Sequence, residues 1–206
     1  MRNVAEKVDS SIQWLVRDFS QTPNKYLTED DVRMHLCSRL IEHFGSVIRT
    51  QDGDESIPLH SEVRWWGPDG RKDRTDIVIF DVSGLSVTKD VVGGLFKFGQ
   101  IPKKGYASNT PLAAIELKFR RNDGASDKAF IASVKADIHK LKGLHTMMNE
   151  VYSKDLVCRV AALDKKNIIN ESHFSEPPVV MFYQFANISA VAQQVCSGPG
   201  EGYARF

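Results

Sequence analysis

Two apolar segments of the sequence are interrupted by charged side chains. Asp76 lies within RTDIVIFDV, and Glu116 and Lys118 lie within LAAIELKF. Residues two apart on a β-strand point to the same face, so Glu116 and Lys118 are predicted to project side by side from a strand whose other face is apolar. A buried charge is costly unless it is paired or binds a metal. These three side chains are therefore the first candidates for a chemical role.

Two carboxylates on neighbouring strands, with a lysine beside one of them, suit metal-assisted hydrolysis of a phosphodiester. Asp76 and Glu116 would hold Mg²⁺, which prefers oxygen ligands and keeps several waters, and the carbonyl of Leu117 would be a further ligand. Such a metal lowers the pKa of a water and polarises a phosphoryl oxygen. Lys118 would position or deprotonate that water, or offset the growing negative charge. Without metal, we expect only Lys118 and solvent to offset the two carboxylates.

A structural interpretation of the same residues also exists. Asp76 would be an acid at a strand edge, paired with Arg64 or Arg74. Glu116 and Lys118 would be an exposed pair on a solvated sheet face, where such pairs contribute little stability. The order of the surrounding elements favours the metal site over this alternative.

The elements upstream of Asp76 are two helices and a hairpin. Apolar residues at helical spacing predict a helix over 3–19. A second helix is predicted over 28–44, with Thr28 as its N-cap and Gly45 at its end. Two segments rich in β-branched and aromatic residues, separated by a Gly-Pro-Asp-Gly turn, then predict a hairpin over 61–82.

The downstream elements alternate between strand and helix. A strand over 112–119, a helix over 125–150 and a strand over 156–163 predict a right-handed crossover between parallel strands. A C-terminal strand and helix are expected within 178–196. Residues 83–111, which contain glycines, prolines and lysines, are predicted to be an insertion that contacts substrate or a partner.

In this context, Asp76 followed by Glu116-Leu117-Lys118 resembles the D…(D/E)-x-K signature of the PD-(D/E)XK, or restriction-endonuclease-like, nuclease superfamily. The element order over about 28–163 resembles the αβββαβ core of that superfamily. The resemblance implies an α/β fold with a mixed central sheet flanked by helices. The chain departs from the pattern in having Thr75, not proline, before the aspartate and a long gap before the glutamate.

The resemblance also implies roles for individual residues. Asp76 and Glu116 would be metal ligands and Lys118 the catalytic lysine. Many members carry a further acid on the first core helix, and Glu29 fits best because it shares a helix face with Val32 and Leu36. The basic residues near the motif would form a rim that contacts phosphate, unless they are a solvated face: Arg71, Lys72, Arg74, Arg120, Arg121, Lys135, Lys140 and Lys142.

Composition narrows the class of protein. The 206 residues, 42% apolar and 26% charged, suit a single globular domain over 1–206. No apolar run approaches membrane length and the first residues lack a signal core, so we expect a cytoplasmic protein without a membrane partner. The three cysteines and six histidines lack zinc-site spacing. Residues 64–142 carry 15 basic and 9 acidic side chains, which is compatible with a phosphate-rich partner.

The sequence therefore predicts a Mg²⁺-dependent nuclease, with Mn²⁺ as an alternative metal, that hydrolyses phosphodiester bonds of DNA rather than RNA. Restriction, phage defence, transposition and repair are the settings that such an enzyme suits, as a homodimer or within a larger complex. The alternative is a non-cleaving nucleic-acid-binding or assembly subunit with the same fold.

Overall fold

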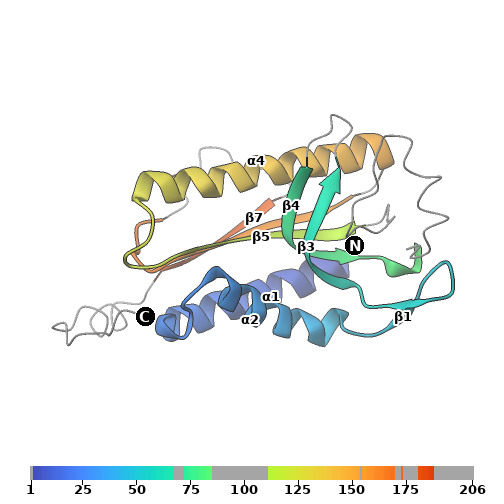
Figure 1. The fold of residues 1–206 in the computed structure, drawn as a ribbon, viewed down its shortest axis with the longest axis horizontal. Coiled ribbons are helices and arrows are strands. Elements are labelled where there is room, and N and C mark those ends of the chain that lie inside the picture. Colours follow the sequence, from blue (N-terminus) through green and yellow to red (C-terminus); the bar gives the residue numbers. More distant parts are fainter. Residues whose placement is uncertain are drawn as a thin grey trace.

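The computed structural model describes residues 2–66, 72–84, 111–153, 155–169, 173 and 181–187. Helices cover both faces of a central sheet (Figure 1), which confirms the predicted α/β class with a mixed sheet. The elements in chain order are α1 (Arg2–Gln21), η1 (Pro23–Lys25), α2 (Glu29–Phe44), β1 (Ile48–Arg49), β2 (Glu55–Ser56), β3 (Leu59–Trp66), β4 (Lys72–Phe80), η2 (Val82–Gly84), β5 (Pro111–Arg120), α4 (Asp127–Tyr152), β6 (Val157–Asp164) and β7 (Met181–Asn187).

The main sheet has the strand order β3-β4-β5-β6-β7. Strand β4 is antiparallel to both of its neighbours, β3 and β5, whereas β5, β6 and β7 run parallel. The parallel pairing of β5 with β6 across α4 agrees with the prediction from sequence. Every residue of β6 is buried, as expected for a parallel strand with helices on both faces.

Alternation along β5 assigns its side chains to two separate cores. Ile115 and Leu117 pack with the apolar faces of α1 and α2, whereas Ala114 packs with the apolar stripe of α4. Glu116 and Lys118 share the face of Ala114 because they differ from it by an even number of positions. The two charged residues of the motif therefore point toward α4.

Helix α2 begins with a complete capping box. The Thr28 side chain accepts a hydrogen bond from the Asp31 amide at 3.1 Å, and the Asp31 carboxylate accepts one from the Thr28 amide at 2.8 Å. The box fixes the first turn of the helix. Glu29 lies in that turn, so its direction depends on the cap.

Thr28→Ala is expected to lower the free energy of unfolding by about 1 kcal/mol, because it removes the N-cap acceptor. Urea denaturation measures the change. Thr22→Ala is the matched control, since the Thr22 side chain bonds the Asp18 carbonyl and caps no helix. An equal loss in both variants would contradict the role of the cap.

Some sequence predictions need correction or lie outside the described residues. The composition of residues 51–58 predicts a turn; residues 51–53 do form one, but Glu55–Ser56 forms β2 and pairs antiparallel with β1. Residues 85–110 of the predicted insertion and 188–196 of the predicted terminal helix are outside the described part of the chain. Among the described helices, none combines the length and the apolarity that a membrane crossing requires.

Candidate functional site

The candidate site forms where β4 stops pairing with β5. The ladder between these strands runs from Ile77–Ile115 toward Phe80, and the β3–β4 hairpin turns away toward α4 (Figure 1). Beyond that point the β5 amides bond to side chains. The Leu117 amide donates to Asp76 Oδ2 at 2.8 Å, and the Phe119 amide donates to Glu29 Oε2 at 3.3 Å. Two acids thus take the place of a neighbouring strand and accept hydrogen bonds from partly buried amides of β5.

The same edge presents a backbone oxygen to the site. The amide and the carbonyl of one strand residue point toward the same neighbouring strand, so the Leu117 carbonyl lies on the side from which Asp76 approaches. Lys118 Nζ is 3.3 Å from this carbonyl oxygen. The Leu117 carbonyl oxygen therefore faces the charged side chains of the site.

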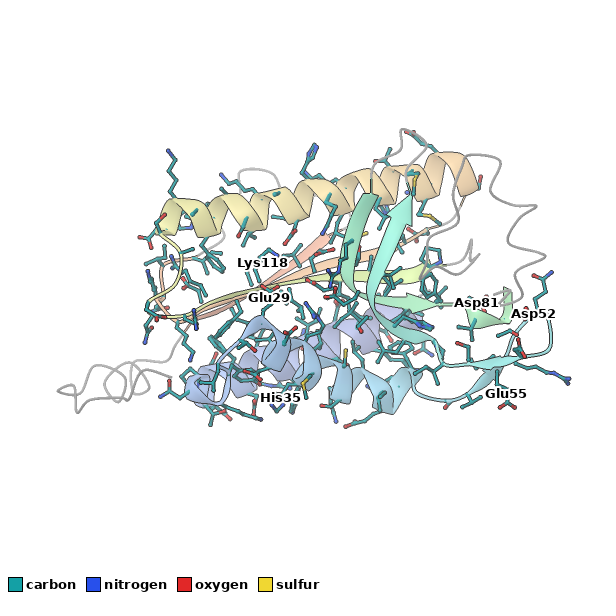
Figure 2. All side chains as sticks on the ribbon, viewed as in Figure 1. Glu29, His35, Asp52, Glu55, Asp81 and Lys118 are labelled. Atoms are coloured by element: carbon teal, nitrogen blue, oxygen red, sulfur yellow. The ribbon has the colours of Figure 1, made fainter. Side chains whose placement is uncertain are left out.

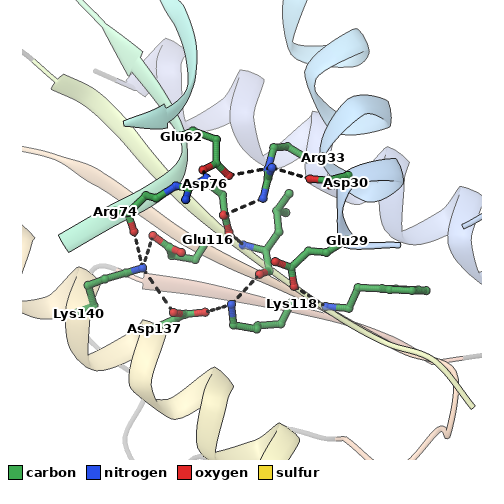
Figure 3. A network of polar contacts seen from close by, with 12 residues as sticks. Glu29, Asp30, Arg33, Glu62, Arg74, Asp76, Glu116, Lys118, Asp137 and Lys140 are labelled. Atoms are coloured by element: carbon green, nitrogen blue, oxygen red, sulfur yellow. Dashed lines mark hydrogen bonds and ion pairs between the residues drawn. The ribbon is translucent and has the colours of Figure 1, made fainter. Parts of the chain in front are cut away.

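All four predicted catalytic residues lie in one polar cluster (Figure 3). Extending the β4–β5 register by one residue sets Asp76 opposite Glu116, Lys118 follows on the same face, and Glu29 approaches from α2. Figure 2 shows Glu29 and Lys118 together, far from Asp52, Glu55 and Asp81 at the other end of the molecule. The structure thus brings together residues that lie up to 89 positions apart in the sequence.

Glu116 is the most buried acid of this cluster, with an exposed fraction of 2%. Burial raises its pKa to about 8, the Lys140 cation opposes the shift, and the negative charge of Asp76 adds to it. Lys140 Nζ lies 2.8 Å from Glu116 Oε1 and donates a hydrogen bond to the Arg74 carbonyl at 2.7 Å. Helix α4 thus provides a counter-ion for the motif glutamate.

Lys118 pairs with Asp137, also on α4, at 3.0 Å. Burial by itself would lower the pKa of Lys118, but the carboxylates of Asp137, Glu29 and Asp76 outweigh it and raise that pKa above its ordinary value. Lys118 is therefore an ammonium ion at neutral pH. Burial also raises the pKa of Glu29, with Lys118 opposing and Asp76 adding to the shift.

Asp76 is paired with Arg33 of α2, whose Nη2 is 3.2 Å from Asp76 Oδ1. Arg33 also contacts Glu62 at 2.8 Å, and Glu62 pairs with Arg74. The β3–β4 register places Glu62 opposite Asp76, so Arg33 bridges two like charges. Glu62 has φ of 60°, a strained value for a residue other than glycine, and such strain often occurs at functional sites.

Two sequence expectations about the pairing are wrong. Lys118 is not the only cation at the carboxylates, because Arg33 and Lys140 pair with Asp76 and Glu116. The alternative of an exposed Glu116–Lys118 pair is wrong as well, since Glu116 is buried beneath α4. Tertiary contacts from two helices produce both differences.

The expected phosphate rim also needs correction at Arg120. Its side chain is 1% exposed, forms a bidentate pair with Asp164 at 2.7 Å and contacts Asp127 at 2.7 Å. Arg120 therefore holds the ends of β5 and β6 to the start of α4 and cannot reach a phosphate. Its neighbour Arg121 remains exposed.

One further residue of the site, Asp137, lies outside the motif but is recognisable from the sequence. Asp137 lies among Val134, Ile138 and Leu141, on the apolar stripe of α4, and is only 8% exposed. An acid on a buried stripe indicates a polar partner in the fold. Arg33 carries no comparable signal, because charged residues are common on the flanks of amphipathic helices.

The donor chemistry of the cluster fits a hard divalent cation. Asp76, Glu116 and the Leu117 carbonyl offer only oxygen ligands, which Mg²⁺ prefers, and a buried carboxylate of raised pKa gains from a nearby positive charge. Across the described segments, no three acidic, histidine or cysteine side chains are already grouped as a metal site requires. The acids are instead held by Arg33 and Lys140.

Comparison with protein-family models, with curated proteins and with solved structures found no match for this chain. Function must therefore be inferred from the geometry of the site.

Proposed function

We propose that this protein is a Mg²⁺-dependent nuclease with a restriction-endonuclease-like core, acting on DNA. One observation carries the proposal. Asp76 and the Glu116-Leu117-Lys118 segment converge from adjacent strands at the open edge of β5, with Glu29 beside them. This combination of two acids, a backbone oxygen and a lysine suits phosphodiester hydrolysis better than a structural ion pair.

Asp76, Glu116 and the Leu117 carbonyl would hold Mg²⁺, or Mn²⁺ in its place. The cation, when bound, would lower the pKa of a water and polarise a phosphoryl oxygen. Before the cation arrives, Arg33 pairs with Asp76, and Lys140 lies in contact with Glu116. Both cations keep other partners if they release these acids: Arg33 has Glu62, and Lys140 has Asp137 and the Arg74 carbonyl.

The raised pKa of Lys118 indicates its part in the reaction. An ammonium ion cannot remove a proton, so Lys118 would stabilise the negative charge that grows on the phosphate as water attacks and the leaving oxygen departs. Asp137 would keep Lys118 charged and directed into the site. Glu29 lies beside Lys118, and burial raises its pKa above the ordinary value, so it would accept the proton of the attacking water.

The alternative of a non-cleaving subunit has an observation in its favour, because each acid of the cluster is already paired or hydrogen-bonded. Such a network can exist for stability alone. The two functions differ in whether divalent metal binds and whether DNA is cut.

The test is incubation of the purified protein with plasmid, single-stranded DNA and RNA, with Mg²⁺, with Mn²⁺ and with chelator. We expect metal-dependent cleavage of DNA. Asp76→Ala and Lys118→Ala should each lower its rate by at least about a hundredfold, because Asp76 would hold the metal and Lys118 would stabilise the charge on the reacting phosphate. Asp81→Ala is the matched control, since Asp81 lies at the other end of the molecule (Figure 2) and bonds Ser83.

Cleavage that survives chelator, or that Asp76→Ala leaves undiminished, would contradict the proposed nuclease. DNA binding without cleavage under any metal condition would identify the non-cleaving subunit instead.

A further inference from the structure

A pocket of about 400 Å³ adjoins the proposed metal site. Its walls come from the start of α2, the end of β5, the loop before α4 and the first turn of α4. Glu29 lines this pocket while its carboxylate accepts the Phe119 amide and is coupled to Lys118. The pocket and the site are therefore continuous along the open edge of β5.

The lining combines apolar surface with one exposed cation. Leu27, Phe119 and Phe130 provide apolar walls, and Leu27 is 64% exposed. Arg121 lines the pocket with a side chain that is 60% exposed, and its Nε is 3.7 Å from Asp123 Oδ1. An ion pair this long and this exposed to solvent holds the Arg121 guanidinium only weakly. The guanidinium can therefore turn to an anionic ligand.

We infer that this pocket receives one unpaired nucleotide next to the scissile phosphodiester, with its base against the apolar walls and an adjacent phosphate at Arg121. The inference rests on the proposed nuclease function and names its substrate class: DNA with single-stranded character at the cleavage point. The required chemistry is an aromatic or apolar surface for a base and a basic group for the backbone, the combination that binds single strands.

The size of the pocket suits a single base better than a base that remains in a duplex. A volume of this order suits one small organic group, whereas a paired base carries its partner and stacked neighbours with it. Such a base must leave the stack to enter the pocket, and this costs least where it is already unpaired. Single strands and unpaired ends should therefore bind better than blunt duplexes.

Binding is tested with a dye-labelled single-stranded oligonucleotide and the blunt duplex of the same sequence, by fluorescence anisotropy in Ca²⁺ and in chelator. We expect tighter binding of the single strand by the wild type. Ala125→Trp, which fills the pocket from an exposed position, and Arg121→Ala should each weaken that binding by about tenfold. The matched controls are Ala132→Trp, on the exposed side of α4, and Arg49→Ala, in β1 beyond the other end of α2.

Losses confined to the two pocket variants support the nucleotide site, and they do so even if no cleavage is found, in which case only the nuclease proposal fails. Equal affinity for single strand and duplex, or unchanged binding by both pocket variants while their circular dichroism shows them folded, overturns the nucleotide site. Metal-dependent cleavage that needs Asp76 but tolerates Ala125→Trp on single strands overturns the pocket and leaves the nuclease intact.

Discussion

Replacing Glu116 by glutamine is expected to abolish metal-dependent cleavage and, at the same time, to stabilise the metal-free protein at mildly alkaline pH. The two effects share a cause. The folded protein holds the pKa of Glu116 at about 8, against an ordinary value of 4.5, because burial penalises the carboxylate. Folding therefore favours the protonated acid, and its ionisation opposes folding.

The sign of the pH dependence follows from linkage. Between pH 4.5 and about 8, the unfolded chain has released this proton while the folded protein still binds it. The contribution of Glu116 to the free energy of unfolding therefore falls as pH rises through this window and levels off above it. Glutamine does not titrate, so Glu116→Gln should remove the fall. Lys140 keeps Asp137 and the Arg74 carbonyl as partners in the variant.

Urea denaturation in chelator, at several pH values across this window, measures the stability effect. The matched control is Glu55→Gln, on the exposed hairpin β1–β2. Added Mg²⁺ or Mn²⁺ should raise the melting temperature of the wild type, because a ligand of the native state stabilises it, and should not raise that of Glu116→Gln. Cleavage should fall by at least about a hundredfold.

A purely structural role for Glu116 predicts another pattern. The glutamine variant would then be less stable than the wild type at every pH, and metal would change the melting temperature of neither protein. The combination of a stabilised variant with a lost metal effect cannot come from a broken structural ion pair.

The framework of this site is predictable from sequence because the relevant signals are local. Thr28 and Gly45 mark the two ends of α2, and the apolar spacing along α4 sets its buried face. The alternation of side chains along β5 is enough to place Glu116 and Lys118 on one face. Each of these features depends on residues within a few positions of one another.

The counter-ions are not predictable in the same way. Arg33 is 43 residues from Asp76 along the chain, and the packing of α2 against β4 brings them together. The open edge of β5 is also a tertiary feature, because it depends on where β4 stops pairing. Periodicity predicts that two strands exist but does not fix where their ladder ends.

Arg120 shows how a prediction made without tertiary contacts assigns a residue the wrong role. Its place directly after the motif strand predicts a phosphate contact, as for Arg121. The structure buries Arg120 against Asp164 and the Phe130 ring, with the guanidinium 4.8 Å from the ring centre, and leaves Arg121 exposed. Adjacent residues of one type therefore differ in burial, because Arg120 is the last residue of β5 and Arg121 lies in the loop that follows it.

This assignment leads to the largest stability effect that we expect in the protein. Asp164 is fully buried and accepts hydrogen bonds from Arg120 and from the amides of Lys166, Ile168 and Ile169. Burial by itself would raise the pKa of Asp164, but these hydrogen bonds and the Arg120 cation outweigh it and hold that pKa below its ordinary value. Asp164→Ala removes the acceptor and leaves the buried Arg120 cation with Asp127 as its one anionic partner among the described residues.

Asp164→Ala should therefore lower the free energy of unfolding by about 3–5 kcal/mol, which for a chain of this size shifts the melting temperature by roughly 6–20 °C. Thermal melts followed by circular dichroism measure the change, and Asp164→Asn, which keeps one acceptor oxygen, provides a milder variant if the alanine protein does not fold.

Arg120→Ala should be destabilised for the same reason, whereas Arg121→Ala should change stability by less than about 0.5 kcal/mol. If Arg120 instead contacted phosphate, its removal would weaken DNA binding and leave the melting temperature unchanged. The pair of arginine variants thus separates the residue that holds the sheet to α4 from the residue that we propose contacts the substrate.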